Sequence, residues 1–138
     1  MSQRDDVSLT PPTHGREEAA LNNYLMALAV VMMLLGLRQW AVILGVIGGP
    51  DGPFEAMSTP WKLATMHLAV TDLVAAVGLW LRVAWGKVIW VFAAVSEIAL
   101  HTVFIATFGG DLLVVAFHVA TLAAFAVLAV NARRQPAA

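Results

Sequence analysis

Long apolar runs alternate with short polar joints along most of the chain. Four runs stand out, each of about 19 to 27 residues. At a rise of about 1.5 Å per residue, each is long enough to cross a hydrocarbon core of about 30 Å. Because backbone polar groups in lipid must bond within their own segment, the runs predict helices. The expected helices are residues 21–47, 61–83, 88–108 and 112–130.

The joints between the runs carry residues that begin or end helices. The Gly- and Pro-rich stretch 48–53 is expected to stop the first helix. Ser58 and Pro60 are expected to cap and begin the second helix, and Asp111 to cap the fourth. The short stretch 84–86 predicts a tight turn, so the second and third helices should form a hairpin.

Composition favours a membrane bundle over a soluble one. Hydrophobic residues make up 60% of the chain and charged residues only 12%, whereas soluble domains carry about 25% charged residues. A soluble core of this length cannot hide so much apolar surface. The sequence therefore predicts an all-α integral membrane four-helix bundle in a single domain, residues 19–132.

Lysine and arginine give the expected bundle a direction. Only Lys62 falls on the side of the Gly/Pro-rich loop, against six on the opposite side: Arg4, Arg16, Arg82, Lys87, Arg133 and Arg134. Because positive residues gather on the cytoplasmic side, both termini are expected inside the cell, with the bundle in the bacterial inner membrane. Residues 1–18 are then a mobile cytoplasmic tail rather than a signal peptide, and 133–138 a second cytoplasmic tail.

Six ionisable side chains lie inside the apolar runs, where such groups are costly and usually face a bundle interior, a cavity or a partner. Counted along the expected helices, three histidines share one depth, about six or seven residues below the outer face: His67, His101 and His118. A second layer near mid-membrane holds Arg38, Asp72 and Glu97. Glu97 and His101 are four residues apart, so they share a helix face.

Three interpretations of this buried polar cluster stay open. Imidazoles completed by a carboxylate are common ligands of transition metals, which makes His67, His101 and His118 candidate metal ligands. Histidines on facing helices also ligate haem, and a histidine beside an acid can bind a quinone or relay protons. The cluster can instead be structural, with Arg38 pairing Asp72 and Glu97.

No catalytic signature accompanies the cluster, which argues against an enzyme acting alone. The chain has no cysteine, and it lacks a phosphate-binding loop, a dinucleotide fingerprint, a nucleophile elbow and HExxH. A net charge of −1 without a basic run argues against a nucleic-acid partner. The expected partners are membrane lipid and other membrane subunits or a second copy of the chain.

The second run contains Asp72-Leu73-x4-Gly78-Leu79 after the Gly/Pro-rich loop, and the third has an acid at Glu97. In these residues and in its four-span layout, the chain resembles the small four-helix bacterial membrane proteins that include the DoxX-like families. The stretch 85–87, Trp-Gly-Lys, is similar to the turn of an uncharacterised bacterial membrane family. The DoxX-like resemblance implies work beside quinone-linked redox enzymes.

The sequence thus predicts an accessory or small-ligand-binding membrane subunit linked to redox or proton chemistry through the polar cluster. The sequence does not identify a cofactor; the cluster is compatible with a quinone, a haem or a transition metal. The alternatives are a transition-metal-binding or metal-handling membrane protein, and a purely structural subunit of a larger membrane complex.

Overall fold

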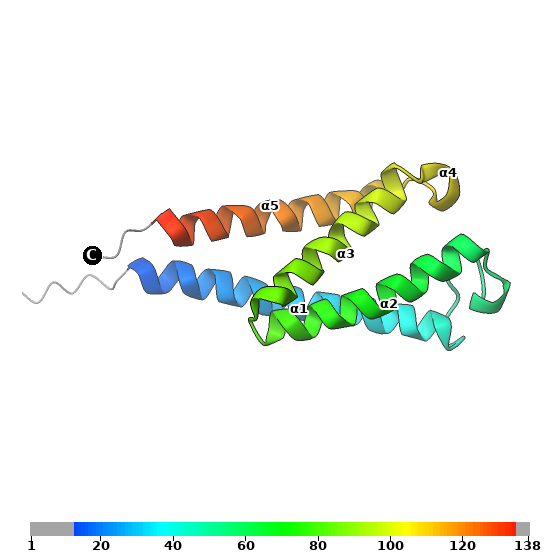
Figure 1. The fold of residues 1–138 in the computed structure, drawn as a ribbon, viewed down its shortest axis with the longest axis horizontal. Coiled ribbons are helices and arrows are strands. Elements are labelled where there is room, and N and C mark those ends of the chain that lie inside the picture. Colours follow the sequence, from blue (N-terminus) through cyan, green and yellow to red (C-terminus); the bar gives the residue numbers. More distant parts are fainter. Residues whose placement is uncertain (1–12, 135–138) are drawn as a thin grey trace, which may run out of the picture.

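The computed structural model describes residues 13–134 of the chain. This part is helical apart from its joints: α1 (Thr13–Ile43), the 3-10 turn η1 (Phe54–Ala56), α2 (Thr59–Trp80), α3 (Ala84–Thr102), α4 (Ile105–Phe108) and α5 (Leu112–Arg134). Figure 1 shows α1 and α2 as an antiparallel hairpin. Helix α3 runs obliquely from the end of α2 to the short α4, and α5 returns toward the start of α1 (Figure 1).

Four of these helices are long and apolar enough to cross a membrane: residues 15–43, 59–80, 84–102 and 112–134. The prediction of an all-α chain with four helices of spanning length is therefore confirmed. Both ends of the described chain lie at the same end of the molecule (Figure 1), called the terminal end below. The opposite end, which holds the α1–α2 connection and α4, is called the loop end.

The first helix is shifted toward the N-terminus relative to the expected 21–47. It takes in residues 13–18 of the expected tail, because the Arg-Glu-Glu-Ala-Ala stretch 16–20 consists of strong helix formers. It ends at Ile43 because Gly45 adopts a left-handed φ of 72°. The expected tail residues 1–12 and 135–138 lie outside the described part of the chain.

The third expected helix, 88–108, is two helices with a break between them. Helix α3 starts four residues earlier than expected, at Ala84, and ends at Thr102. The N–H of Phe104 bonds to the carbonyl of Ala99, five residues back, at 3.1 Å. This bond departs from the four-residue ladder of an α-helix, so the chain bends before α4 adds one more turn.

The cap residues behave differently at α2 and α5. The Asp111 carboxylate Oδ1 accepts hydrogen bonds from the N–H groups of Leu113 at 3.0 Å and Val114 at 3.2 Å, which confirms the predicted cap of the last helix. Ser58 makes no side-chain cap bond at α2. Its own N–H instead donates to Asp51 Oδ2 at 3.0 Å, while Pro60 lies in the first turn as expected.

The terminal end of the bundle is filled with apolar side chains. Its buried cluster comes from α1, α2 and α3: Leu25, Leu28, Ala29, Met32, Ala75, Ala76, Leu79, Trp90 and Ala93. Phe125 of α5 packs edge-on against Trp90, with ring centroids 5.4 Å apart. Gly78 and Gly86 are so close that a Cβ atom on either would collide with the other's backbone. This contact holds α2 and α3 in the predicted hairpin.

Candidate functional site

A cavity of about 490 Å³ lies between the helices at the loop end. Its walls come from α1, α2, α3, α5 and the α4–α5 joint. Its polar lining consists of Arg38, Gln39, Thr65, Glu97, His101 and Asp111. Apolar and aromatic side chains complete the wall, among them Leu35, Leu68, Trp61 and Phe108. This mixed lining is typical of a site that holds a largely apolar molecule by a few polar groups.

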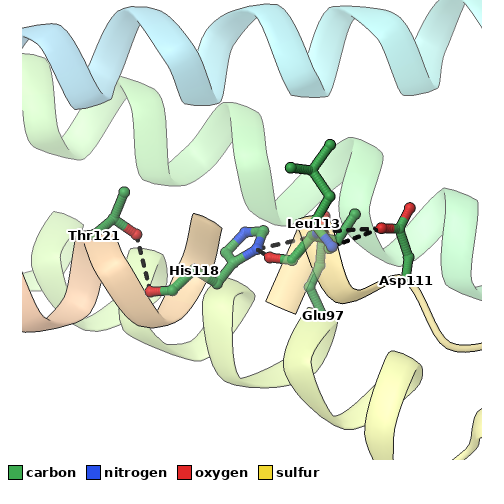
Figure 2. A network of polar contacts seen from close by, with 6 residues as sticks. Glu97, Asp111, Leu113, His118 and Thr121 are labelled. Atoms are coloured by element: carbon green, nitrogen blue, oxygen red, sulfur yellow. Dashed lines mark hydrogen bonds and ion pairs between the residues drawn. The ribbon is translucent and has the colours of Figure 1, made fainter. Parts of the chain in front are cut away.

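Glu97 connects the cavity to a buried histidine on α5. Its Oε2 lies 3.8 Å from His118 Nδ1, and the two side chains are only 12% and 3% exposed. His118 Nδ1 also lies 2.9 Å from the carbonyl oxygen of Val114. A carbonyl only accepts, so Nδ1 carries a hydrogen and donates it to Val114. Figure 2 shows the two side chains facing each other from α3 and α5.

The other ring nitrogen of His118 is left without a partner. Among residues 13–134 nothing hydrogen-bonds to its buried Nε2. Buried polar atoms are almost always paired, so an unpaired one needs an explanation. The side chain is therefore available to a water, a proton or a ligand atom that reaches it.

Arg38 and His101 stand on opposite walls of the cavity. Arg38 lies five residues before the end of α1, and its side chain is exposed. The half-buried His101 places Nδ1 3.2 Å from the carbonyl oxygen of Gly109. Within residues 13–134, the contact between an acidic and a basic side chain closer than 4.0 Å is Glu97–His118. The structural alternative, in which Arg38 pairs with Asp72 and Glu97, is therefore not formed there.

Asp72 is buried away from the cavity wall. The residue is 1% exposed, and its Oδ2 has no hydrogen-bond partner among the described residues. The two predicted layers are thus rearranged: Arg38, Glu97 and His101 share the cavity, His118 touches Glu97, and Asp72 stands apart. Apolar packing alone does not account for a buried carboxyl group.

His67 does not join the other histidines. It lines a separate, shallower groove between α2 and α3 with Ser96 and Phe104, and its ring meets Phe92 edge-on at 5.5 Å. Within residues 13–134, no group of three or more His, Asp or Glu side chains lies close enough to hold a metal ion. The expected metal site of His67, His101 and His118 is therefore not assembled, because equal depth does not fix which helix face a residue occupies.

Several residues of the cavity wall have no counterpart in the sequence analysis. Gln39 and Thr65 are neutral polar residues within the apolar runs, whereas the predicted cluster contains only ionisable residues. Asp111 was expected only as a helix cap, and it also lines the cavity. Neutral polar residues at the depth of Glu97 and His101 are the signal that points to this wall.

The chain matches the model of a sequence family. The profile of the family of unknown function DUF6163 covers residues 19–136, which include all the site residues above. No curated protein and no solved structure matches the chain.

Proposed function

The chain belongs to the DUF6163 family, and from its site we propose that it is a multi-pass subunit of the bacterial inner membrane that binds a quinone headgroup. The loop-end cavity is the observation that carries this proposal. The protein acts as an accessory subunit: it holds the ring and exchanges protons with it, beside a redox partner that handles the electrons.

Three observations support the membrane location. Four helices have the length and apolarity of membrane spans. Large apolar side chains point outward along them, including Leu34 at 62%, Val88 at 65% and Leu113 at 80% exposure. Such a surface is stable against lipid and not against water. The six-to-one Lys/Arg bias of the sequence supports an orientation with the terminal end in the cytoplasm.

The cavity suits a quinone in size and chemistry. Its volume of about 490 Å³ falls within the roughly 300–1,000 Å³ of small-molecule sites. Trp61 and Phe108 offer aromatic surface for the ring. The Arg38 guanidinium donates to a quinone carbonyl oxygen, and Glu97 accepts the O–H of the reduced form.

The Glu97–His118 pair gives the cavity a route for protons. Reduction of a quinone to a hydroquinone takes up two electrons and two protons. Both side chains of the pair can carry a proton. Their facing atoms lie 3.8 Å apart across the α3–α5 contact, beyond hydrogen-bond distance, so a proton passes between them through a bridging water. The DoxX-like resemblance, which implies work beside quinone-linked enzymes, agrees with this assignment. A metal-handling role has less support, because residues 13–134 hold no suitable ligand group.

Tryptophan fluorescence tests the proposal in detergent-solubilised protein. A short-chain, water-soluble quinone should quench the fluorescence in a saturable way, because Trp61 lines the cavity. Trp61→Phe should remove most of the saturable quenching. The matched control Trp85→Phe, at the α2–α3 turn, should keep it. Quenching that never saturates, or that the two variants reduce equally, would reject the cavity as the binding site.

A further inference from the structure

A second hollow lies on the outer face of the α1–α2 hairpin, separate from the cavity. This groove has a volume of about 370 Å³ and only apolar lining, with Val30, Met33 and Leu34 of α1 facing Val77 and Trp80 of α2. Three of these side chains are strongly exposed: Val30 at 49%, Leu34 at 62% and Trp80 at 54%. The groove therefore faces whatever surrounds the protein.

The guanidinium group of Arg82 lies near one end of this groove. The Arg82 guanidinium Nη2 lies 3.7 Å from Met26 Sδ, and Met26 is about one helical turn before Val30 on α1. A thioether is a weak acceptor. No carboxylate of residues 13–134 lies within 4.0 Å of Arg82. Its remaining donors are thus available to a ligand at the terminal end of the groove.

The end of α2 has the same backbone conformation as the end of α1, but an arginine stands where α1 has a glycine. Both helices end with the same pair of hydrogen bonds: Gly45 N–H to Val42 and Val46 N–H to Ala41 after α1, Arg82 N–H to Leu79 and Val83 N–H to Gly78 after α2. The residue at the left-handed position has a φ of 72° in Gly45 and 57° in Arg82. A left-handed φ favours glycine, because any side chain is strained there. The conformation of the turn therefore does not explain why an arginine occupies this position.

We propose that the groove and Arg82 form a binding site for an anionic phospholipid of the cytoplasmic leaflet. One acyl chain lies in the groove, and the phosphate accepts hydrogen bonds from the Arg82 guanidinium. Arginine matches phosphate oxygens in a bidentate way, and basic residues at the cytoplasmic ends of membrane helices recognise acidic lipid headgroups. The inference rests on the membrane location proposed above and is independent of the quinone cavity.

The dimensions favour a lipid chain over a partner helix. The α1 residues that line the groove run from Ala29 to Leu34, a rise of about 8 Å along the helix axis. A partner helix is about 10–12 Å wide with its side chains and needs a longer matching face. A segment of one flexible acyl chain can occupy a short apolar groove, because it needs no long complementary helix face.

Native mass spectrometry of the full chain released from detergent tests the site with two probes, phosphatidylglycerol and phosphatidylcholine. Phosphatidylglycerol should be retained in preference to phosphatidylcholine. Arg82→Gln should reduce that retention about fivefold, the equivalent of about 1 kcal/mol for one arginine at an anionic lipid surface. The control Arg134→Gln removes an exposed charge from the last turn of α5 and should leave the retention unchanged.

A second variant separates lipid binding from folding. Arg82→Gly suits the left-handed position, so it should melt no lower than the parent while losing the lipid preference. Equal retention of both lipids, equal effects of Arg82→Gln and Arg134→Gln, or a dimer that excludes lipid would overturn the proposal. Carbonate extraction of cell membranes separates a failure of the lipid site from a failure of the membrane location. A chain released by carbonate contradicts the membrane location itself.

Discussion

The two ends of the bundle are built from the same four long helices but differ in packing: the terminal end is filled with apolar side chains, and the loop end encloses a partly polar cavity. At the terminal end, Leu79 and Trp90 are fully buried and the α2 and α3 backbones meet at Gly78 and Gly86. At the loop end, the helices separate around a cavity lined by Arg38, Glu97 and His101. Since this chain can close one end with small and apolar residues, packing does not require the polar opening at the other. The loop end is therefore the part of the bundle suited to binding.

The largest expected effect comes from the closest contact of the terminal end. Gly86→Ala should lower the free energy of unfolding by about 4 kcal/mol, above the usual range for overpacking, because the new Cβ meets the Gly78 backbone and not a side chain that can rotate away. Thermal unfolding in detergent measures it. The control Gly15→Ala, a helical glycine with open space around it, should be neutral or stabilising. A similar loss of unfolding free energy in both variants would contradict the claim that the Gly78–Gly86 contact is tightly packed.

Matched leucines on α2 compare the two ends directly. Leu79 is 0% exposed in the apolar cluster, whereas Leu68, at 7%, borders the cavity. Leu79→Ala should cost about 3 kcal/mol of stability, because it opens a void in a filled region. Leu68→Ala should cost about half as much, because it only enlarges an existing space. Equal costs in chemical denaturation would mean that the loop end is packed as tightly as the terminal end.

The acid of the cavity should matter for binding more than for folding. Glu97→Gln keeps the size of the side chain but removes the ionisable carboxyl group that faces His118. We expect about tenfold weaker binding of the hydroquinone, whose O–H Glu97 accepts in the proposed site, the equivalent of about 1.4 kcal/mol, with less than about 1 kcal/mol lost in stability. The control His67→Gln changes a histidine in the α2–α3 groove and should leave the hydroquinone titration unchanged. A loss of binding in both variants would contradict the placement of the ligand.

Arg38 should have the smallest effect on stability. In the structural interpretation of the sequence, Arg38 forms ion pairs with Asp72 and Glu97 and so stabilises the fold. In the structure its side chain is exposed, and no carboxylate of residues 13–134 lies within 4.0 Å of it. Arg38→Ala should therefore cost less than about 0.5 kcal/mol in thermal unfolding, and Arg38→Lys should retain more quinone binding than the alanine variant. A severe loss of folded protein that lysine repairs would restore the anchor interpretation.

The length and apolarity of the runs were enough to predict four long helices, and local chemistry was enough to predict the Asp111 cap and the α2–α3 hairpin. Rotation about each helix axis was not predictable in this way. His67 was expected beside the other two histidines, but its ring packs against Phe92 and does not line the cavity. The break after Thr102 was also missed, since it depends on a backbone bond from Phe104 to Ala99 and not on glycine or proline.

The most direct test of the account is to map where a photoreactive quinone attaches to the protein in its native membrane. After illumination and digestion, mass spectrometry should find the label on residues 97–101 of α3 and on residues 108–114 around the start of α5, which line the cavity. Arg38→Ala should reduce this labelling, because its guanidinium donates to the quinone carbonyl in the proposed site. Label concentrated instead on the apolar groove around Val30 and Trp80, or spread evenly over the lipid-facing helices, would contradict a quinone site at the loop end.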